Sequence, residues 1–235
     1  MTRPCLDKLL GAVAHELRSP LAAALSGVYV IVSESAVDPE AGQTLGGVQR
    51  QLQQAIRLVE DLFDVCAGSL GKLSLRKEEV ALSEVVGRAV ETARPALAAR
   101  RHRLTVSLPP GPVFLEADPL RLGQVLTNLL TNAAKFTDPG GHVRLSAEAE
   151  AGQALLRVRD NGRGIASDLL PRLFDPFWQV PGTNARGTRG LGLGLALVKS
   201  LVELHEGSVA AHSAGPGLGA EFTVRLPTCA CTATQ

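Results

Sequence analysis

Three polar side chains recur along one predicted helix at spacings of four and three residues. They are Asn128, Asn132 and Lys135, in the segment Asn128–Phe136 with the sequence NLLTNAAKF. Residues three and four positions apart lie on the same face of a helix. Amide oxygens are ligands that Mg²⁺ accepts, and a lysine ammonium group attracts phosphates. The pattern indicates a site for a magnesium-bound phosphate compound, although the polar face of an ordinary surface helix has the same appearance.

A carboxylate followed by two glycines comes directly after a predicted strand. The segment is Asp160–Ile165, with the sequence DNGRGI, in which Gly162 and Gly164 allow the backbone to turn tightly. Asp160 then lies at the end of a sheet, where its carboxylate can accept a hydrogen bond from an exocyclic amine and select adenine over guanine. A glycine-rich turn without a ligand is the common alternative for such a pattern.

A second glycine-rich segment, Gly190–Leu195, runs into a predicted helix with the sequence GLGLGL. Successive backbone N–H groups at the start of a helix can bind an anion. The segment is neither a Walker A loop nor a dinucleotide fingerprint, because the required Lys-Ser/Thr and the glycine spacing are missing. Before it, residues 174–190 show no periodicity, so we expect a loop that closes over a ligand. Phe174 either anchors this loop or simply fills the core.

His15 lies on the polar side of the first predicted helix. A helical wheel places it about 140° from the centre of the apolar stripe. Glu16 is its neighbour and Ser19 lies one turn further along. A neutral imidazole is nucleophilic near pH 7, and a carboxylate can orient it and accept its proton. From these residues alone, a solvated surface histidine is the simpler interpretation.

The segment His15–Leu21, with the sequence HELRSPL, resembles the H-box of sensor histidine kinases. The resemblance implies that His15 accepts the γ-phosphoryl group of ATP and that Glu16 acts as its base or orients it. The fifth position of this box usually holds Thr or Asn, which positions water when the kinase dephosphorylates its partner. Ser19 keeps a hydroxyl group there, so phosphatase activity stays open.

Four further segments resemble the remaining boxes of this family, and they occur in the family's order. They are the N-box Asn128–Phe136, the G1 box Asp160–Ile165, the F-box Phe174–Phe177 and the G2 box Gly190–Leu195. The resemblance implies that ATP and Mg²⁺ bind here. Further residues implied in nucleotide binding are Asn128, Asn132, Lys135, Phe136, Asp160, Gly162, Gly164, Ile165, Phe174, Arg186, Gly190, Gly192, Leu193 and Gly194.

The family resemblance assigns roles to several of these residues. Asn132 binds Mg²⁺, with Asn128 beside the metal and the phosphates, and Asp160 recognises adenine. The G2 box holds the triphosphate, and Arg186 or Arg189 reaches the γ-phosphate. In the related ATP-binding folds of gyrase, Hsp90 and MutL, a glutamate that acts as general base for hydrolysis would occupy the position of Asn128.

An asparagine cannot accept a proton in place of that glutamate, which fits transfer of phosphate to histidine rather than to water. Two alternatives stay open. One is a scaffold that binds ATP and dimerises without transferring phosphate. The other is an ATPase or chaperone-like relative of the gyrase group.

The N-terminal part, residues 1–70, predicts two amphipathic helices that carry and present His15. The expected helices are Pro4–Ser35 and Glu40–Gly68, separated by Val37-Asp38-Pro39, which breaks the pattern. Apolar residues in the second helix alternate steps of three and four. A hairpin with such a stripe is poorly stable alone, so we expect two hairpins to form a four-helix bundle in a homodimer. The alternative is that the stripe packs on the second domain of the same chain.

Residues 71–227 predict an α+β fold, in which helices cover one face of a mixed sheet. The family resemblance identifies this arrangement as the Bergerat ATP-binding sandwich. The expected strands are Arg103–Leu108, His142–Ala149, Gln153–Arg159, Ser208–Ser213 and Glu221–Leu226. The expected helices are Ser83–Arg100, Pro119–Phe136 and Leu191–His205. We expect residues 228–235 to form a disordered tail.

Composition excludes several other functions. Of the 235 residues 45% are hydrophobic and the net charge is +1, which favours a folded core and gives no general attraction to nucleic acid. No segment has the uninterrupted apolar length of a membrane span. The four cysteines match no zinc spacing, and a reduced cytoplasmic location is the simplest expectation. The family resemblance implies an aspartate of a response regulator receiver domain as partner, and a sensor outside this chain.

Overall fold

The computed structural model describes residues 17, 20–29, 31, 39–69, 73–180 and 191–229. The chain divides into two compact units, the first ending at Leu73 and the second beginning at Ser74. The sequence placed this boundary three residues earlier, after residue 70.

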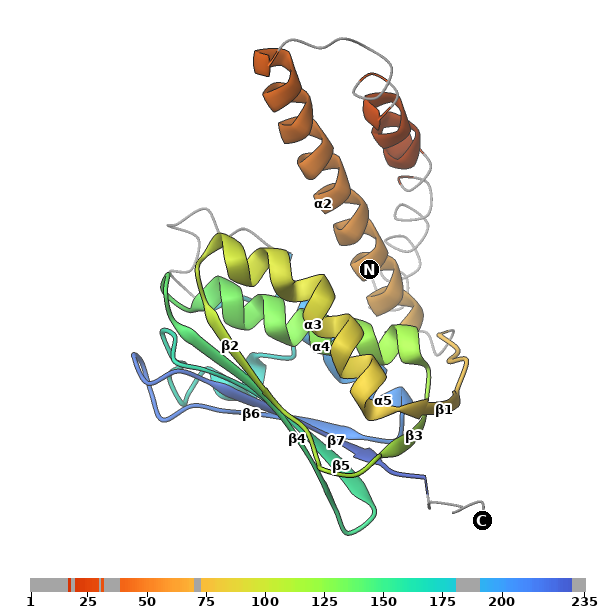
Figure 1. The fold of residues 1–235 in the computed structure, drawn as a ribbon, viewed down its shortest axis with the longest axis vertical. Helices are drawn as coiled ribbons and strands as arrows, with labels where there is room; N and C mark the ends of the chain where they lie inside the picture. The colour runs from red at the N-terminus through yellow and green to blue at the C-terminus, as the bar shows by residue number, and fades with distance from the viewer. Residues whose placement is uncertain are drawn as a thin grey trace, which may run out of the picture. The chain divides into compact units, whose positions relative to one another are not determined.

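The first unit is helical. Helix α2 (Pro39–Ser69) lies beside a second helical segment, residues 20–29 (Figure 1). Gln53 Nε2 on α2 donates a hydrogen bond of 3.1 Å to the hydroxyl oxygen of Tyr29, which joins the two segments as a hairpin. Pro39 begins the helix, where its fixed φ is suitable and its missing N–H costs nothing. The expected bounds of the second helix, Glu40–Gly68, are confirmed to within one residue at each end.

The second unit contains a five-stranded mixed sheet in the order β2-β4-β5-β7-β6. Strand β2 pairs in parallel with β4, and the other neighbours are antiparallel. The expected mixed sheet is therefore confirmed, with each strand within one residue of its expected bounds. The strands are β2 (Arg103–Ser107), β4 (His142–Glu150), β5 (Gln153–Asp160), β6 (Ser208–His212) and β7 (Glu221–Pro227).

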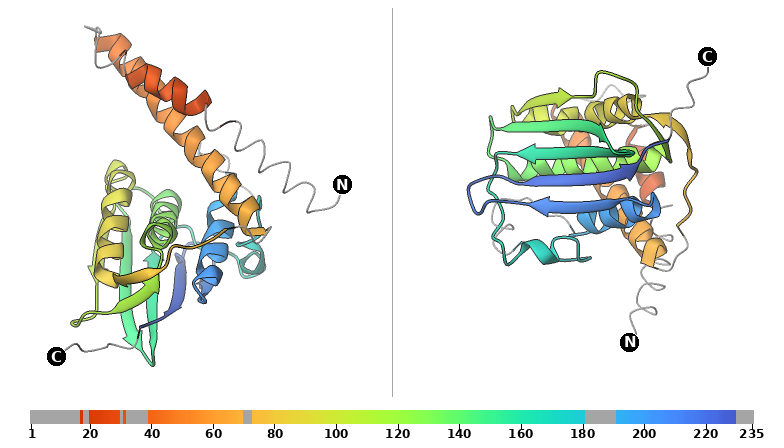
Figure 2. Two further views of the ribbon diagram at one scale, coloured as in Figure 1. Left: turned by 90° about the vertical axis from the view of Figure 1, so that its right-hand side faces the viewer. Right: turned by 90° about the horizontal axis from the view of Figure 1, so that it is seen from below.

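Three helices cover one face of this sheet. Figure 2 (right) shows the sheet in front with α3 (Leu82–Ala99), α4 (Pro119–Phe136) and α5 (Gly194–Leu204) behind it. Alternate residues of the central strands, such as Val143 and Leu145, are fully buried because successive side chains of a strand point to opposite faces. The α/β sandwich expected from the sequence is confirmed, and its core is mainly aliphatic.

Helix α4 offers a direct test of this core, because two leucines close together on it differ in burial. Leu122 is 0% exposed, whereas Leu120 is 78% exposed. Leu122→Ala is expected to lower the free energy of unfolding by roughly 2–5 kcal/mol, because it removes buried methyl groups and leaves a cavity. Leu120→Ala is the matched control and should change it by less than about 0.5 kcal/mol. Equal urea unfolding midpoints for the two variants would contradict the placement of α4.

Two features of the second unit differ from the expectation. Helix α5 begins at Gly194 rather than Leu191, because Gly192 has a φ of +72° and cannot continue a right-handed helix. A small antiparallel pair, β1 (Glu78–Ala81) and β3 (Phe114–Ala117), was not predicted, because four-residue strands that contain glutamate carry little signal. A short 3₁₀ helix, η1, covers Leu170–Arg172.

The C-terminal boundary also needs a correction. Thr228 and Cys229 donate backbone hydrogen bonds to Gly152 O (2.9 Å) and Phe114 O (3.0 Å), so these two residues are not part of a disordered tail. Within the residues that the structure describes, no helix combines the length and the apolar character needed to cross a membrane.

Candidate nucleotide-binding site

The carboxylate of Asp160 is buried at the end of β5, with 6% of the residue exposed. Its Oδ1 accepts hydrogen bonds from the backbone N–H groups of Gly162 (2.8 Å) and Ala220 (3.3 Å). Burial raises the pKa of this carboxyl, and the two hydrogen bonds oppose that effect. In the described part of the chain no group donates to Oδ2. Asp160 is thus rigidly held and keeps one oxygen for a ligand.

Helix α4 carries the N-box, including the three polar residues that the sequence singles out. Asn128, Asn132 and Lys135 are all half-buried on this helix, at positions four and three apart. The side-chain Nδ2 of Asn128 is buried and has no hydrogen-bond partner among the described residues. A buried donor without a partner is costly, so it marks a position that a ligand atom can satisfy. An amide nitrogen donates and cannot coordinate a cation, so its partner is an acceptor such as a phosphate oxygen.

Two cations flank the ring of Phe136 at the end of α4. The Nζ of Lys135 lies 4.9 Å from the ring centroid, and the Cζ of Arg163 lies 5.0 Å from it. Burial lowers the pKa of Lys135, and the positive charge of Arg163 lowers it further. No ion pair joins either cation to an acid within the described residues. The sequence analysis did not single out Arg163, although its place inside the G1 box is a usable signal.

Gly162 brings the G1 turn against the end of α4. A Cβ atom at Gly162 would lie 2.5 Å from the carbonyl oxygen of Phe136 and 2.8 Å from Oδ1 of Asp160. The N–H of Arg163 also donates to Phe136 O (3.2 Å). The buried carboxylate, the aromatic ring and the two cations therefore gather at one place.

The loop between β6 and β7 supports the same turn, a role that the sequence analysis did not anticipate. Gly164 has a φ of +64°, and a Cβ atom there would overlap the carbonyl oxygen of Gly215. The next residue, Ile165, donates its N–H to Oγ of Ser213 (3.0 Å), and that hydroxyl donates to Gly219 O (2.7 Å). Residues 213–219 therefore hold the G1 turn from outside.

Gly164→Ala is expected to damage this turn, because both the positive φ and the close carbonyl oppose a side chain. The cost should be roughly 1–3 kcal/mol in the free energy of unfolding, with weaker nucleotide binding. Gly111→Ala is the control, because a Cβ atom at Gly111 meets nothing within 4 Å. Urea unfolding and nucleotide titration of both variants measure the difference. Equal behaviour of the two would refute the tight packing of the turn.

The F-box and the G2 box meet at the base of the loop between them. Phe174 packs edge-to-face on Phe222 of β7, with ring centroids 6.5 Å apart. Phe177 donates its N–H to Gly192 O (3.0 Å), which brings the two ends of the loop together. Phe174 thus packs against a strand of the sheet, and its expected role as an anchor of the loop stays a prediction.

Helix α5 begins directly after Gly192 and Leu193 of the G2 box. Leu193, the N-cap residue, is buried, and no side chain caps the first turn that begins at Gly194. The first N–H groups of a helix have no partner within the helix, and they carry the positive end of its dipole. Gly192, Leu193 and Gly194 thus present backbone donors.

The C-terminal end of α4, which carries Phe136, is also held by Arg100, the residue that follows α3. Arg100 donates from Nη1 to the carbonyl oxygens of Ala134 (3.1 Å), Lys135 (2.7 Å) and Thr137 (3.0 Å). These carbonyls lie at the C-terminus of a helix, where they lack partners within it. Arg100 thereby fixes the backbone that carries Lys135 and Phe136. No motif in the sequence indicates this role of Arg100.

Six of the expected site residues lie outside the described residues. They are His15, Glu16, Ser19, Arg186, Arg189 and Gly190. The others lie in the second unit, on α4, at the end of β5 and on both sides of the loop between the F-box and the G2 box.

Two family models match this chain. Residues 117–229 match the "Histidine kinase-, DNA gyrase B-, and HSP90-like ATPase" family, and residues 6–65 match the "His Kinase A (phospho-acceptor) domain". The first match contains α4, the G1 turn and the start of α5. The second contains His15.

Individual proteins agree with these matches. The sensor protein KdpD of Clostridium acetobutylicum is 33% identical over 223 residues, which are 94% of this chain and 24% of KdpD. The structure of full-length ShkA in complex with AMPPNP has a TM-score of 0.77 at 27% identity, over 96% of this chain and 47% of ShkA. The mycobacterial sensor histidine kinase MprB has a TM-score of 0.58 at 31% identity, over 64% of this chain and 98% of that structure.

The chain belongs to the sensor histidine kinases of two-component systems. Its catalytic unit has the ATP-binding fold of that family. The chain spans about a quarter of the length of its curated relative KdpD.

Proposed function

We propose that this chain transfers the γ-phosphoryl group of ATP to His15, and that the phosphohistidine then passes the group to an aspartate of a response regulator. The observation that carries the proposal is the arrangement around Gly162. There, among the residues that the structure describes, a buried carboxylate with one open oxygen lies beside Phe136 and two cations that have no acidic partner. A purine with an exocyclic amine and a chain of phosphates combines the groups that such a site can satisfy. The scaffold and ATPase alternatives also bind ATP, so the test must follow the phosphate.

In the proposed complex, Oδ2 of Asp160 accepts a hydrogen bond from the adenine amine. Ile165 and the glycines Gly162 and Gly164 shape the pocket for the base. Phe136 packs near the base, while Lys135 and Arg163 supply positive charge. The open N–H groups from Gly192 to Gly194 bind the phosphates, with Gly190 and Arg186 completing that part of the site.

The N-box fits a bound Mg²⁺ ion together with phosphates. The orphaned Nδ2 of Asn128 is satisfied by a phosphate oxygen, which leaves the amide oxygens of Asn132 and Asn128 as the hard ligands that Mg²⁺ requires. When bound, the ion supplies charge neutralisation for the phosphates. Position 128 holds an asparagine rather than a carboxylate, so it cannot act as a general base for water. The site is therefore suited to binding and orienting ATP rather than to hydrolysing it.

The transfer itself is a displacement at phosphorus. An imidazole nitrogen of His15 forms the new N–P bond, the bond from the γ-phosphorus to the β,γ-bridging oxygen breaks, and ADP leaves. Glu16 orients the ring and accepts the proton that the imidazole loses. Positioning and charge neutralisation, rather than covalent chemistry by the ATP site, provide most of the rate.

The proposal includes a homodimer built from two hairpins. Four apolar side chains of the first unit are between 43% and 47% exposed, which gives the hairpin an apolar surface to pair. They are Leu17, Tyr29, Ile31 and Val48. We further propose residues 1–70 as the phosphotransfer domain, residues 71–227 as the catalytic domain, and a cytoplasmic location. Phosphatase activity toward the regulator belongs to the proposal and depends on Ser19.

The test compares two products in one reaction with Mg²⁺ and ATP. A kinase forms chain-bound phosphate and ADP in equal amounts during the first turnover, with little free phosphate. An ATPase releases free phosphate with each ADP and leaves the chain unlabelled. A scaffold binds ATP and forms neither product, so either of these outcomes would overturn the proposal.

A further inference from the structure

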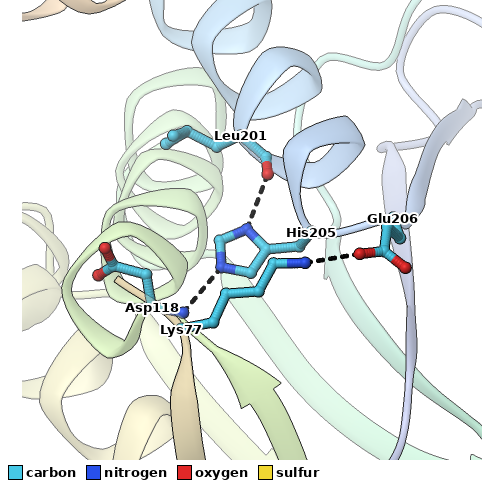
Figure 3. Close-up of polar contacts among 5 residues, drawn as sticks. All are labelled: Lys77, Asp118, Leu201, His205 and Glu206. Carbon is cyan, nitrogen blue, oxygen red and sulfur yellow. Dashed lines mark hydrogen bonds and ion pairs between the residues drawn. The ribbon is translucent and has the colours of Figure 1, made fainter. Parts of the chain in front are cut away.

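A buried histidine connects the end of α5 to the start of α4. His205, the residue after α5, is 2% exposed. Its Nδ1 lies 2.8 Å from Leu201 O, and its Nε2 lies 3.0 Å from the backbone nitrogen of Asp118 (Figure 3). A carbonyl oxygen can only accept, so Nδ1 carries the proton and donates. The remaining nitrogen, Nε2, then accepts from the N–H of Asp118, which requires a neutral imidazole.

Asp118 uses its two carboxylate oxygens for two different segments. Oδ1 accepts from the N–H groups of Leu120 and Arg121, both at 3.1 Å, and caps the first turn of α4. Oδ2 accepts from the N–H of Arg76 at 3.0 Å. Burial alone would raise the pKa of Asp118, but these three backbone hydrogen bonds lower it below its ordinary value. The carboxylate is therefore saturated and charged.

A surface ion pair joins the same segments a second time. Lys77 Nζ lies 2.7 Å from Oε1 of Glu206, the residue next to His205 (Figure 3). Such an exposed pair contributes little alone. Together with the Arg76 hydrogen bond, however, it attaches Arg76 and Lys77 to both helices. These two residues follow α2 closely, after its end at Ser69.

The attached segment lies at the start of the second unit, which begins at Ser74, so it is the part of the chain through which α2 leads into that unit. Helix α4 carries Asn128 and Asn132, and α5 begins with the G2 glycines, so both helices contribute to the proposed ATP site. We propose that the His205–Asp118 pair anchors the Arg76–Lys77 segment to α4 and α5 and thereby positions the ATP-bound unit for transfer to His15. The inference rests on the proposed kinase function. It makes His205 and Asp118 positioning residues, remote from the reacting atoms.

The anchor can be separated from the helix cap, because each uses its own oxygen. Asp118→Asn keeps one oxygen for the first turn of α4, where asparagine is an equally good cap. Its amide nitrogen then replaces Oδ2 and cannot accept from Arg76. Arg76→Pro removes the donor from the other side of the same bond, whereas Arg76→Ala keeps the N–H and loses only the side chain.

The neutral state of His205 predicts a pH dependence. Burial lowers its pKa below the ordinary 6.5, with the carbonyl of Leu201 and Asp118 opposing and Lys77 assisting, and Glu206 is the other charged group beside it. The unfolded chain thus binds a proton that the folded chain resists, so stability falls as pH drops below 6.5. In His205→Gln, the side-chain oxygen can accept the hydrogen bond but does not titrate. The stability of this variant should therefore decrease less than that of the wild type as the pH drops below 6.5. Identical pH profiles of the urea midpoint would contradict the role of Nε2.

The deciding experiment measures ATP affinity and the rate of His15 labelling at saturating ATP in the full chain. Asp118→Asn and Arg76→Pro should each slow labelling about tenfold while ATP affinity stays within about twofold, because the defect is one of positioning. Arg76→Ala should match the wild type. Hydrogen exchange of residues 74–78 should accelerate in Asp118→Asn, which also covers the case in which Arg76→Pro fails to fold.

Three results would overturn the anchor. They are wild-type labelling rates in Asp118→Asn, a loss of ATP affinity equal to the loss of rate, and an Arg76→Ala defect as large as that of Asp118→Asn. A wild-type chain that binds ATP and gains no label would instead refute the proposed function, which separates the two failures.

Discussion

Asp160→Asn is expected to weaken ATP binding by roughly tenfold to a hundredfold, because a charged hydrogen bond is lost at a buried position. Asparagine can still accept from Gly162 and Ala220 with its oxygen. Its amide nitrogen then faces the adenine amine, so that two donors meet. Titration calorimetry with a non-hydrolysable ATP analogue measures the change. Asp168→Asn, an exposed position nearby in the same segment, is the matched control.

The unfolding stability of Asp160→Asn distinguishes a role of Asp160 in binding from a role in the fold. Burial raises the pKa of Asp160, so the charged carboxylate destabilises the fold at any pH above its ordinary pKa of 3.8. Asp160→Asn should therefore unfold at an equal or higher urea concentration than the wild type at pH 7. Lost affinity together with lost stability would show that Asp160 is a structural residue, and unchanged affinity would refute its role as the adenine acceptor.

His15→Gln is expected to abolish labelling by ATP completely while ATP affinity stays within about twofold, because glutamine offers no nucleophilic nitrogen and residue 15 is not among the residues proposed to bind the nucleotide. Label is measured with γ-labelled ATP and Mg²⁺, and affinity by calorimetry. His212→Gln, which changes an exposed histidine of β6, is the control and should be labelled like the wild type. Residual label in His15→Gln at the wild-type rate would contradict the phosphoacceptor assignment.

At an ATP concentration far below the Kd of Asp160→Asn, the two variants also report how the proposed dimer works. In a mixture of His15→Gln and Asp160→Asn, one chain brings an intact ATP site and the other an intact acceptor. Label on the Asp160→Asn chain then indicates transfer across the dimer. Its absence, with both chains mixed before assembly, indicates transfer within one protomer.

The periodic elements of this fold could be read from the sequence. The bounds expected for helix α4 match the observed ones, and its buried residues Leu122, Val125 and Leu129 recur at helical spacing. The expected strands are short runs rich in residues that favour β-structure, and alternate residues of these runs are buried in the folded chain. The start of α5 was misjudged, because the left-handed conformation of Gly192 depends on its contact with Trp178.

Tertiary hydrogen bonds were beyond sequence reasoning. The contacts of Arg100 with the last carbonyls of α4 join residues more than thirty positions apart. Every residue has a backbone carbonyl, so the sequence does not mark which ones Arg100 will contact. The same holds for the bond from the Arg76 N–H to Asp118. Sequence patterns identify which side chains can do chemistry, while the backbone groups that hold them become visible only once the chain is folded.

The central claim is that ATP phosphorylates His15, and its most direct test is the chemistry of the label. The chain is incubated with Mg²⁺ and γ-labelled ATP, divided between acid and alkali, and digested to locate the labelled peptide. A phosphoramidate is predicted, so the label should be stable in alkali, lost in acid and confined to the peptide that contains His15. A label that survives acid, or one located on another peptide, would contradict the account.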